Sequence, residues 1–101
     1  MRVSVVICGY TMERLTLFNA AVDSVLAQTH DMVEVIIIID GNPELDARTA
    51  DRYGGVEAIR IEAHAQNQGI SASRTRGAEL ATGEVVAFID DDAVAEPTWI
   101  A

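Results

Sequence analysis

The stretch EVIIII (34–39), followed by the turn residues DGNP (40–43), decides the fold. A run of isoleucines with no polar face predicts a strand that is buried on both sides, which is typical of a parallel sheet. Two further segments have this character, RVSVVIC (2–8) and EVVAFI (84–89). A fourth, VEAIRIE (56–62), alternates between apolar and polar residues, as a strand nearer the sheet edge would. The sequence therefore predicts four strands.

Helical patterns separate these strands. The segment 11–29 places its apolar residues on one helical stripe and has Thr11 as its N-cap. The segments 44–53 and 70–81 also predict helices, although Gly77 weakens the second of them. The resulting order, βαβαβαβ, predicts an α/β fold with a mainly parallel sheet and helices on both faces.

Composition limits the class of protein. The 101 residues suffice for one small domain, and 50% of them are hydrophobic, so a packed core is feasible. The formal net charge of -9 argues against a nucleic-acid surface, which needs clustered Lys and Arg. The single cysteine, Cys8, permits no internal disulfide and suits a reducing compartment. The first apolar run is too short to span a bilayer and lacks the layout of a signal peptide, so we expect a cytoplasmic protein.

Three consecutive aspartates, Asp90, Asp91 and Asp92, directly follow the last predicted strand. Like charges this close together repel one another. A divalent cation would offset the repulsion, and clustered carboxylate oxygens suit Mg²⁺ or Mn²⁺. Because alternate residues of an extended chain point the same way, we expect Asp90 and Asp92 to face such a site together. Most acidic runs are solvated loops, and that alternative stays open for the triplet taken alone.

The ends of the strands favour a ligand site. Parallel strands place their carboxyl ends on one edge of the sheet, and ligands bind outside that edge. The first strand ends at CGY (8–10), the second at Asp40, and the fourth at the aspartates just described. A metal ion at this edge would allow an acidic protein to bind an anionic diphosphate, because the cation inverts the local charge.

The chain resembles the N-terminal half of the inverting family 2 glycosyltransferases, which have the GT-A fold. Family motifs such as VSVVIPTYN, SVLAQT, EVIVVDDGS, N.G.S.ARN.G and GE.VAFLDDD are matched in order by VSVVICGYT (3–11), SVLAQTH (24–30), EVIIIIDGN (34–42), NQGISASRTRG (67–77) and TGEVVAFIDDDAVAEPTWI (82–100). The likeness covers nearly the whole chain. It implies that residues 1–101 form a single donor half-domain, a Rossmann-like three-layer sandwich without its acceptor half.

The resemblance also implies a site for a nucleotide-diphosphate sugar, for which we expect a UDP-sugar. Asp92 and Asp90 would bind the divalent metal. The residues expected to bind the donor nucleotide are Cys8, Gly9, Tyr10, Asp40, Gly69, Arg74, Asp90 and Asp91. The register at Asp40 is open by one residue, because the first aspartate of the family can align with Ile39. Two departures, Cys8-Gly9 for the family's Pro-Thr and Thr75 for the Asn of ARN, affect recognition of the base.

The reaction implied by the resemblance is metal-dependent transfer of a sugar from the nucleotide diphosphate to an acceptor hydroxyl, with inversion. The family's general base lies in its second half, which we expect beyond Ala101, so no catalytic residue is assigned within the chain. We expect the isolated chain to bind donor weakly, to lack transferase activity and to self-associate through an uncovered sheet edge. Membrane association is expected only through a C-terminal part.

Two alternatives stay open. The first is an Mg²⁺-dependent phosphotransferase of the haloacid-dehalogenase type, which also places paired aspartates after a strand. Its nucleophilic aspartate follows the first strand, where this chain has CGY (8–10). The second is a non-catalytic module for nucleotide binding or oligomerisation.

Several polar residues receive no functional role. Glu34 is interpreted as a surface or turn residue. Arg74 and Arg76 diverge on the third helix, so one of the two is interpreted as a solvated surface residue. His64 opens the polar loop HAQNQG (64–69), so we expect its side chain to be exposed. Asn67 is expected to order that loop.

Overall fold

The computed structural model describes residues 2–28 and 33–89 of the chain. In chain order the elements are β1 (Val3–Gly9), the 3₁₀ turn η1 (Met12–Arg14), α1 (Leu15–Leu26), β2 (Val33–Asp40), α2 (Pro43–Tyr53), β3 (Ile59–His64), α3 (Ile70–Leu80) and β4 (Val85–Ile89). The predicted order βαβαβαβ is confirmed. Asp90, Asp91 and Asp92 lie outside the described residues.

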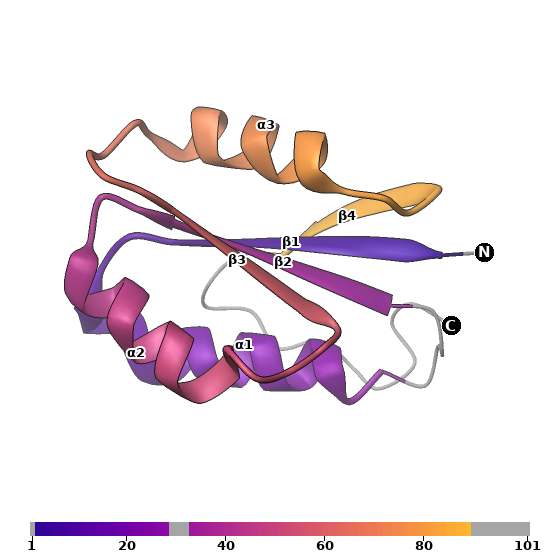
Figure 1. Cartoon of the computed structure of the whole chain (residues 1–101), viewed down its shortest axis with the longest axis horizontal. Coiled ribbons are helices and arrows are strands. Elements are labelled where there is room, and N and C mark those ends of the chain that lie inside the picture. The colour runs from indigo at the N-terminus through magenta and orange to yellow at the C-terminus, as the bar shows by residue number, and fades with distance from the viewer. Residues whose placement is uncertain (1, 29–32, 90–101) are drawn as a thin grey trace.

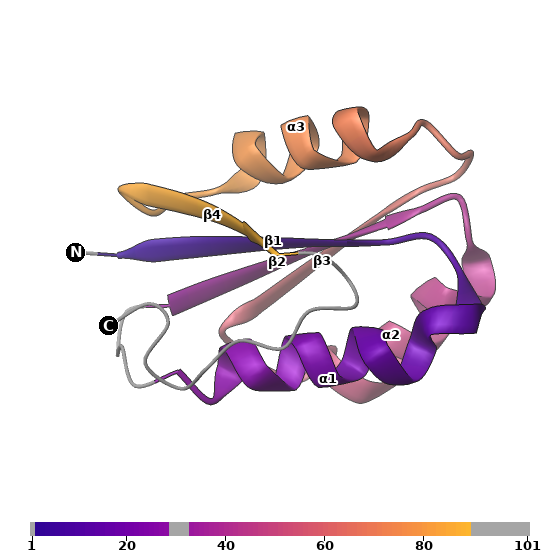
Figure 2. The same cartoon turned by 180° about the vertical axis from the view of Figure 1, so that it is seen from behind.

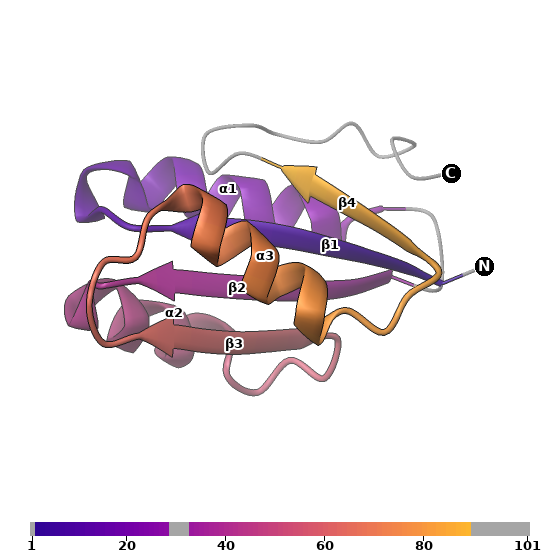
Figure 3. The same ribbon diagram turned by 90° about the horizontal axis from the view of Figure 1, so that it is seen from above.

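The four strands form one parallel sheet in the order β3-β2-β1-β4. α3 covers one face of this sheet, and α1 and α2 cover the other (Figures 1 and 2). Seen from above, α3 crosses over β1 and β2 (Figure 3). The α/β three-layer arrangement is therefore confirmed, and β3 lies at an edge, as its alternating sequence predicted. The expectation that EVVAFI (84–89) is buried on both sides was wrong, because β4 is the other edge strand of the described sheet and none of its residues is buried.

The two central strands supply the core. Every residue of β1 is buried, and so is every residue of β2 after Val33. Because successive side chains point to opposite faces of a sheet, alternate residues enter two separate clusters. The cluster beside α1 and α2 includes Val5, Ile7, Ile37, Ile39, Phe18 and Val22, and the cluster beneath α3 consists of Val6, Cys8, Ile36 and Ile38. Burial on both sides explains why these strands are continuously apolar.

Gly77 allows α3 to approach the sheet closely. A Cβ atom at this position would overlap the side chain of Val6 on β1. Ser73, one turn earlier on the same helix, is the other buried residue of α3. The glycine therefore weakens the helix locally but permits close packing, which the sequence pattern alone did not indicate.

Glu34 is buried, so its interpretation as a surface residue was wrong. Its exposed fraction is 9%. Its Oε2 accepts hydrogen bonds from Ser4 Oγ at 2.8 Å, Thr82 N at 3.1 Å and Thr82 Oγ1 at 2.9 Å. Burial raises the pKa of Glu34, but these hydrogen bonds outweigh it and hold the pKa below its usual value. The carboxylate thus ties the start of β2 to β1 and to the segment that leads into β4.

A polar cluster joins α2 to α1. The Tyr53 hydroxyl donates to Asp23 Oδ1 at 2.8 Å and accepts from Arg52 Nε at 3.0 Å. Arg52 Nη2 donates in turn to Asp23 Oδ2 at 2.9 Å. Burial and the hydrogen bond to Asp23 raise the pKa of Tyr53 to about 12.

The largest differences from the expected boundaries are at the first helix and the third strand. Thr11 caps η1 rather than α1, accepting a hydrogen bond from Glu13 N at 3.2 Å. β3 begins three residues later than predicted, because the preceding residues form a turn in which Ile59 N donates to Val56 O at 3.1 Å. No helix in the described ranges is long and apolar enough to cross a membrane.

Candidate functional site

A cavity of about 420 Å³ opens at the carboxyl ends of the strands. Its wall includes six of the eight residues expected to bind the donor nucleotide, namely Cys8, Gly9, Tyr10, Asp40, Gly69 and Arg74. These residues come from the end of β1, the end of β2 and the start of α3. The structure brings the six together, and their role in binding stays a prediction.

The remaining expected site residues are the three aspartates, and they lie outside the described residues. Ile89, which immediately precedes Asp90 in the sequence, lines the same cavity. Its backbone position on β4 pairs with Ile7 of β1. The roles of Asp90 and Asp91 in nucleotide binding, and of Asp92 and Asp90 in metal binding, therefore stay predictions.

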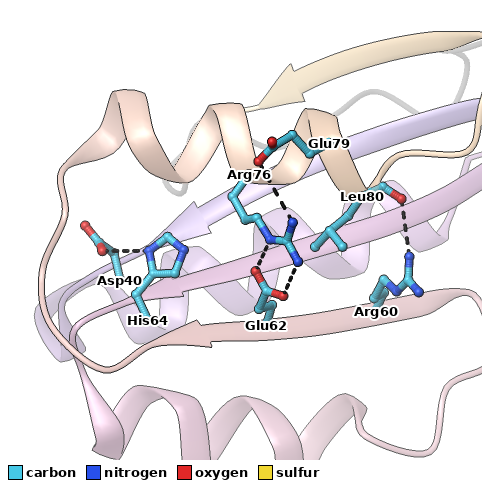
Figure 4. Close-up of polar contacts among 7 residues, drawn as sticks. All are labelled: Asp40, Arg60, Glu62, His64, Arg76, Glu79 and Leu80. Atoms are coloured by element: carbon cyan, nitrogen blue, oxygen red, sulfur yellow. Dashed lines mark hydrogen bonds and ion pairs between the residues drawn. The ribbon is translucent and has the colours of Figure 1, made fainter.

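Asp40 fixes the loop that forms one wall of the cavity. It is 4% exposed. Its Oδ1 accepts from Gln68 N at 2.8 Å, and its Oδ2 accepts from Gly69 N at 2.8 Å. His64 Nδ1 lies 3.1 Å from Oδ1 (Figure 4). Burial raises the pKa of Asp40, but the hydrogen bonds from Gln68, His64 and Gly69 outweigh it and lower the pKa overall.

The expectation that His64 is exposed was wrong. Only 10% of its side chain is exposed, because it lies at the end of β3 against Asp40. Its carbonyl oxygen also accepts a hydrogen bond from Gly41 N at 3.0 Å. Both contacts hold the end of β3 beside the end of β2, which fixes the start of the loop leading to α3.

The last two residues of β2 face opposite sides of the sheet, and how Asp40 aligns with the family's aspartates stays a prediction. Ile39 is fully buried and packs in the cluster beside α1 and α2. Asp40 points to the opposite face and lines the cavity. Of these two residues, Asp40 is the one that brings a carboxylate to the candidate site.

Gly69 begins α3 without a side-chain cap. Its φ of 95° lies in the left-handed region that favours glycine. Asp40 accepts its N–H, while the first N–H groups of the helix itself have no intrahelical partner by helix geometry. The positive end of the helix dipole is therefore directed toward the cavity wall that contains Gly69, Ile70 and Arg74.

Arg14 is a cavity residue that the sequence analysis missed. Its Cζ lies 5.9 Å from the centroid of the Tyr10 ring, within the range of a cation–π contact. Asn42 Nδ2 donates to the Tyr10 carbonyl at 3.3 Å, which ties this segment to the end of β2. Arg14 and Arg74 together place two positive charges on the cavity of a protein whose net charge is -9. Proximity to the end of the first strand was the signal that could have identified Arg14.

The first strand contributes small residues to the site. Cys8 is 8% exposed and belongs to the cluster beneath α3, which agrees with the prediction that the strand RVSVVIC (2–8) is buried. A Cβ atom at Gly9 would lie 2.9 Å from Phe18 Cε1. The end of β1 therefore fits closely against α1 and leaves room on its other side for the cavity.

Arg76 holds α3 against the edge strand. Its Nε and Nη2 donate to the two carboxylate oxygens of Glu62 at 2.6 and 2.9 Å (Figure 4). The hydrogen bonds from Arg76 lower the pKa of Glu62. Arg60 Nη1 donates to the Leu80 carbonyl at the far end of the helix, at 3.3 Å. Arg76 is therefore a packing residue, whereas Arg74 lines the cavity, so the two arginines diverge as helix geometry predicts.

The described residues contain no cluster of three His, Cys, Asp or Glu side chains that could hold a metal. Asp40 is the acidic residue of the cavity wall within these ranges, and both of its oxygens already accept hydrogen bonds. A metal at this edge would therefore depend on carboxylates beyond Ile89, which is where the sequence places Asp90 and Asp92.

Comparison with known proteins places this geometry in a family. The family described as Glycosyl transferase family 2 matches residues 4–101. The chain is 53% identical over 100 residues to the glucosyl-dolichyl phosphate glucuronosyltransferase of Haloferax volcanii, covering 99% of this chain and 32% of that protein. It therefore spans about a third of the length of this relative.

Solved structures agree on the fold. The crystal structure of S. aureus TarS 1-349 in complex with UDP superimposes with a TM-score of 0.84 at 19% identity, covering 99% of this chain and 30% of that one. The complex of the same protein with UDP-GlcNAc gives a TM-score of 0.82 at 20% identity, over 96% and 28%. Since the family match extends over almost the whole sequence and the sheet has the expected topology, the chain belongs to glycosyl transferase family 2.

Proposed function

We propose that the chain is the donor-binding half of a glycosyltransferase that transfers a sugar from a nucleotide-diphosphate sugar to an acceptor hydroxyl, with inversion of the anomeric centre. One observation carries the proposal: a cavity at the carboxyl ends of parallel strands collects residues from β1, β2 and α3 that the family motifs assign to donor binding. Ligands of open α/β sheets bind at this edge.

The cavity has separate features for the two parts of such a donor. Arg14 and Arg74 supply positive charge, which suits a diphosphate. Tyr10, which is 48% exposed, offers its ring as a surface for stacking of a base. Asp40 supports these groups by holding the loop that contains Asn67 and Gly69.

A divalent cation, Mg²⁺ or Mn²⁺, would be held by Asp92 and Asp90 and would neutralise charge on the leaving diphosphate. Asp91, together with Asp90, is assigned to the nucleotide. The chain's own described residues bind and orient the donor. The general base and the acceptor surface are assigned to the part of the protein beyond Ala101, so the isolated chain should bind donor without transferring sugar.

The relatives support a UDP-sugar as the donor. S. aureus TarS has been crystallised with UDP and with UDP-GlcNAc. The Haloferax volcanii relative is named as a glucuronosyltransferase. We therefore propose UDP-glucuronic acid as the first donor to test, with UDP-GlcNAc as its comparison.

Among the described strands, β4 pairs with β1 alone, so its other edge has no partner in this part of the chain. Val85, Val86 and Phe88 are 40%, 36% and 46% exposed there. An apolar edge strand promotes pairing with another chain, so we propose that the isolated chain self-associates through β4. We assign the protein to the cytoplasm, with any membrane contact made through a part beyond this chain.

The proposal is tested by equilibrium binding of UDP with and without Mn²⁺. We expect Mn²⁺ to strengthen UDP binding to the wild type and to Asp51→Ala, a control at an exposed position of α2, but not to Asp92→Ala. Failure of the wild type to bind either ligand would favour the non-catalytic oligomerisation module. Turnover of p-nitrophenyl phosphate would favour the phosphotransferase instead.

A further inference from the structure

Ser73 is an unusual residue of the cavity wall. It lies in α3 and is 1% exposed, yet it lines the cavity. Its Oγ has no hydrogen-bond partner among the described residues. Burying a hydroxyl without a partner costs free energy. The hydroxyl of Ser73 is therefore a buried polar atom of the cavity wall whose partner the described residues do not supply.

Ser73 lies on the part of α3 that forms the cavity wall. It shares a helix face with Gly77, four residues later, and both residues are buried against the sheet. Gly77 packs on Val6, deep in the sheet, whereas Ser73 lies one turn nearer the start of α3, where the cavity opens. The same wall includes the apolar side chains of Val6, Ile70 and Ile89.

We propose that the Ser73 hydroxyl forms a hydrogen bond with the nucleobase of the bound nucleotide. The inference rests on the proposed function, because it names a contact within that same site. A neutral hydroxyl beside apolar side chains suits a flat heterocyclic base, whose faces are apolar and whose edge carries donors and acceptors. The diphosphate is better matched by Arg14 and Arg74, which are charged. Ser73 is thereby a specificity-determining residue for the donor base.

Thr49 provides a matched control within the chain. Its Oγ1 is likewise buried without a partner among the described residues, and its exposed fraction is 0%. It lies on α2, on the opposite side of the sheet from α3 (Figure 1). Removing either hydroxyl should leave the free protein as stable as before or more stable, since an unpaired polar atom is lost in both variants. Only the loss at Ser73 should weaken nucleotide binding.

The test compares Ser73→Ala and Thr49→Val with the wild type, using urea unfolding of the free protein and NMR titration with UDP, uridine and pyrophosphate. We expect Ser73→Ala to raise the Kd for UDP and for uridine about fivefold to tenfold, the value of one typical hydrogen bond. Pyrophosphate binding should not change. Thr49→Val should bind all three ligands like the wild type.

Three results would overturn the inference. If Ser73→Ala binds UDP as tightly as the wild type, Ser73 makes no ligand contact while the proposed function stands. If its Kd rises for pyrophosphate as much as for uridine, or if Thr49→Val weakens binding equally, the effect is not at the base. If the wild type binds neither UDP nor uridine, the proposed function fails and the inference with it.

Discussion

Replacing Asp40 by asparagine tests how the end of β2 organises the candidate site. The carboxylate accepts two backbone N–H groups, from Gln68 and Gly69, each at 2.8 Å, and lies 3.1 Å from His64 Nδ1. Asparagine keeps one oxygen, and its amide nitrogen cannot accept a hydrogen bond. One buried N–H group therefore loses its acceptor and faces another donor.

The magnitude follows from these contacts. A hydrogen bond to a charged group contributes about 1.5–3 kcal/mol, and a buried donor left without a partner costs about 1–3 kcal/mol. Both ranges include the loss of the same hydrogen bond, so they cannot simply be added. We expect Asp40→Asn to lower the free energy of unfolding by about 2–4 kcal/mol. This is a large share of the stability of a small domain.

Urea unfolding followed by circular dichroism measures this loss. The control is Asp51→Asn, which makes the same chemical change at an exposed position of α2 and should alter stability by no more than about 0.5 kcal/mol. Hydrogen exchange gives a local readout, because the amides of Gln68 and Gly69 should lose protection in the variant. If Asp40→Asn unfolds like the control and keeps that protection, the account of the loop is wrong.

Three further predictions concern the packing around the sheet. Gly77→Ala should destabilise the protein by about 1–3 kcal/mol despite its better helix propensity, because its Cβ overlaps Val6, and adding Val6→Ala should recover part of the loss in a double-mutant cycle. Glu34→Gln should cost about 1–2 kcal/mol at neutral pH. Because the pKa of Glu34 is lowered, its carboxylate contributes to stability above about pH 4.5, and this contribution is lost as the pH falls further. Below pH 4.5 the unfolding free energy of the variant should therefore change less with pH than that of the wild type. Tyr53→Phe should lower the free energy of unfolding by about 1 kcal/mol. Because the pKa of Tyr53 is raised to about 12, its hydroxyl contributes fully to stability below about pH 10, and this contribution is lost toward pH 12. The stability of the variant, measured over the same alkaline range, should not show this loss. If any of these variants is as stable as the wild type, the contact assigned to that residue does not stabilise the protein.

The fold was predictable because its signals are local. Continuous apolar runs in β1 and β2 indicate strands buried on both faces, and the alternation in β3 indicates an edge. Burial of Glu34 was not predictable, because the groups that satisfy it, on Ser4 and Thr82, lie 30 and 48 residues away in the sequence. The need for glycine at position 77 likewise arises only when α3 meets Val6.

Part of the candidate site was predictable from the rule that ligands bind at the carboxyl ends of parallel strands. That rule identified the end of β1 and Asp40, which both line the cavity. Applied also to the third strand, it would have identified His64, whose contact with Asp40 was missed. Ser73 could not be found in this way, because its significance depends on burial and on the absence of a partner among the described residues.

The most direct test of the account is an NMR map of nucleotide binding to the ¹⁵N-labelled chain, titrated with UDP in the presence of Mg²⁺. The account predicts that chemical-shift changes concentrate at the carboxyl edge of the sheet, in residues 8–10, 67–74 and 89. No change at millimolar UDP, or changes centred on the opposite edge around Ser4, Glu34 and Thr82, would contradict it.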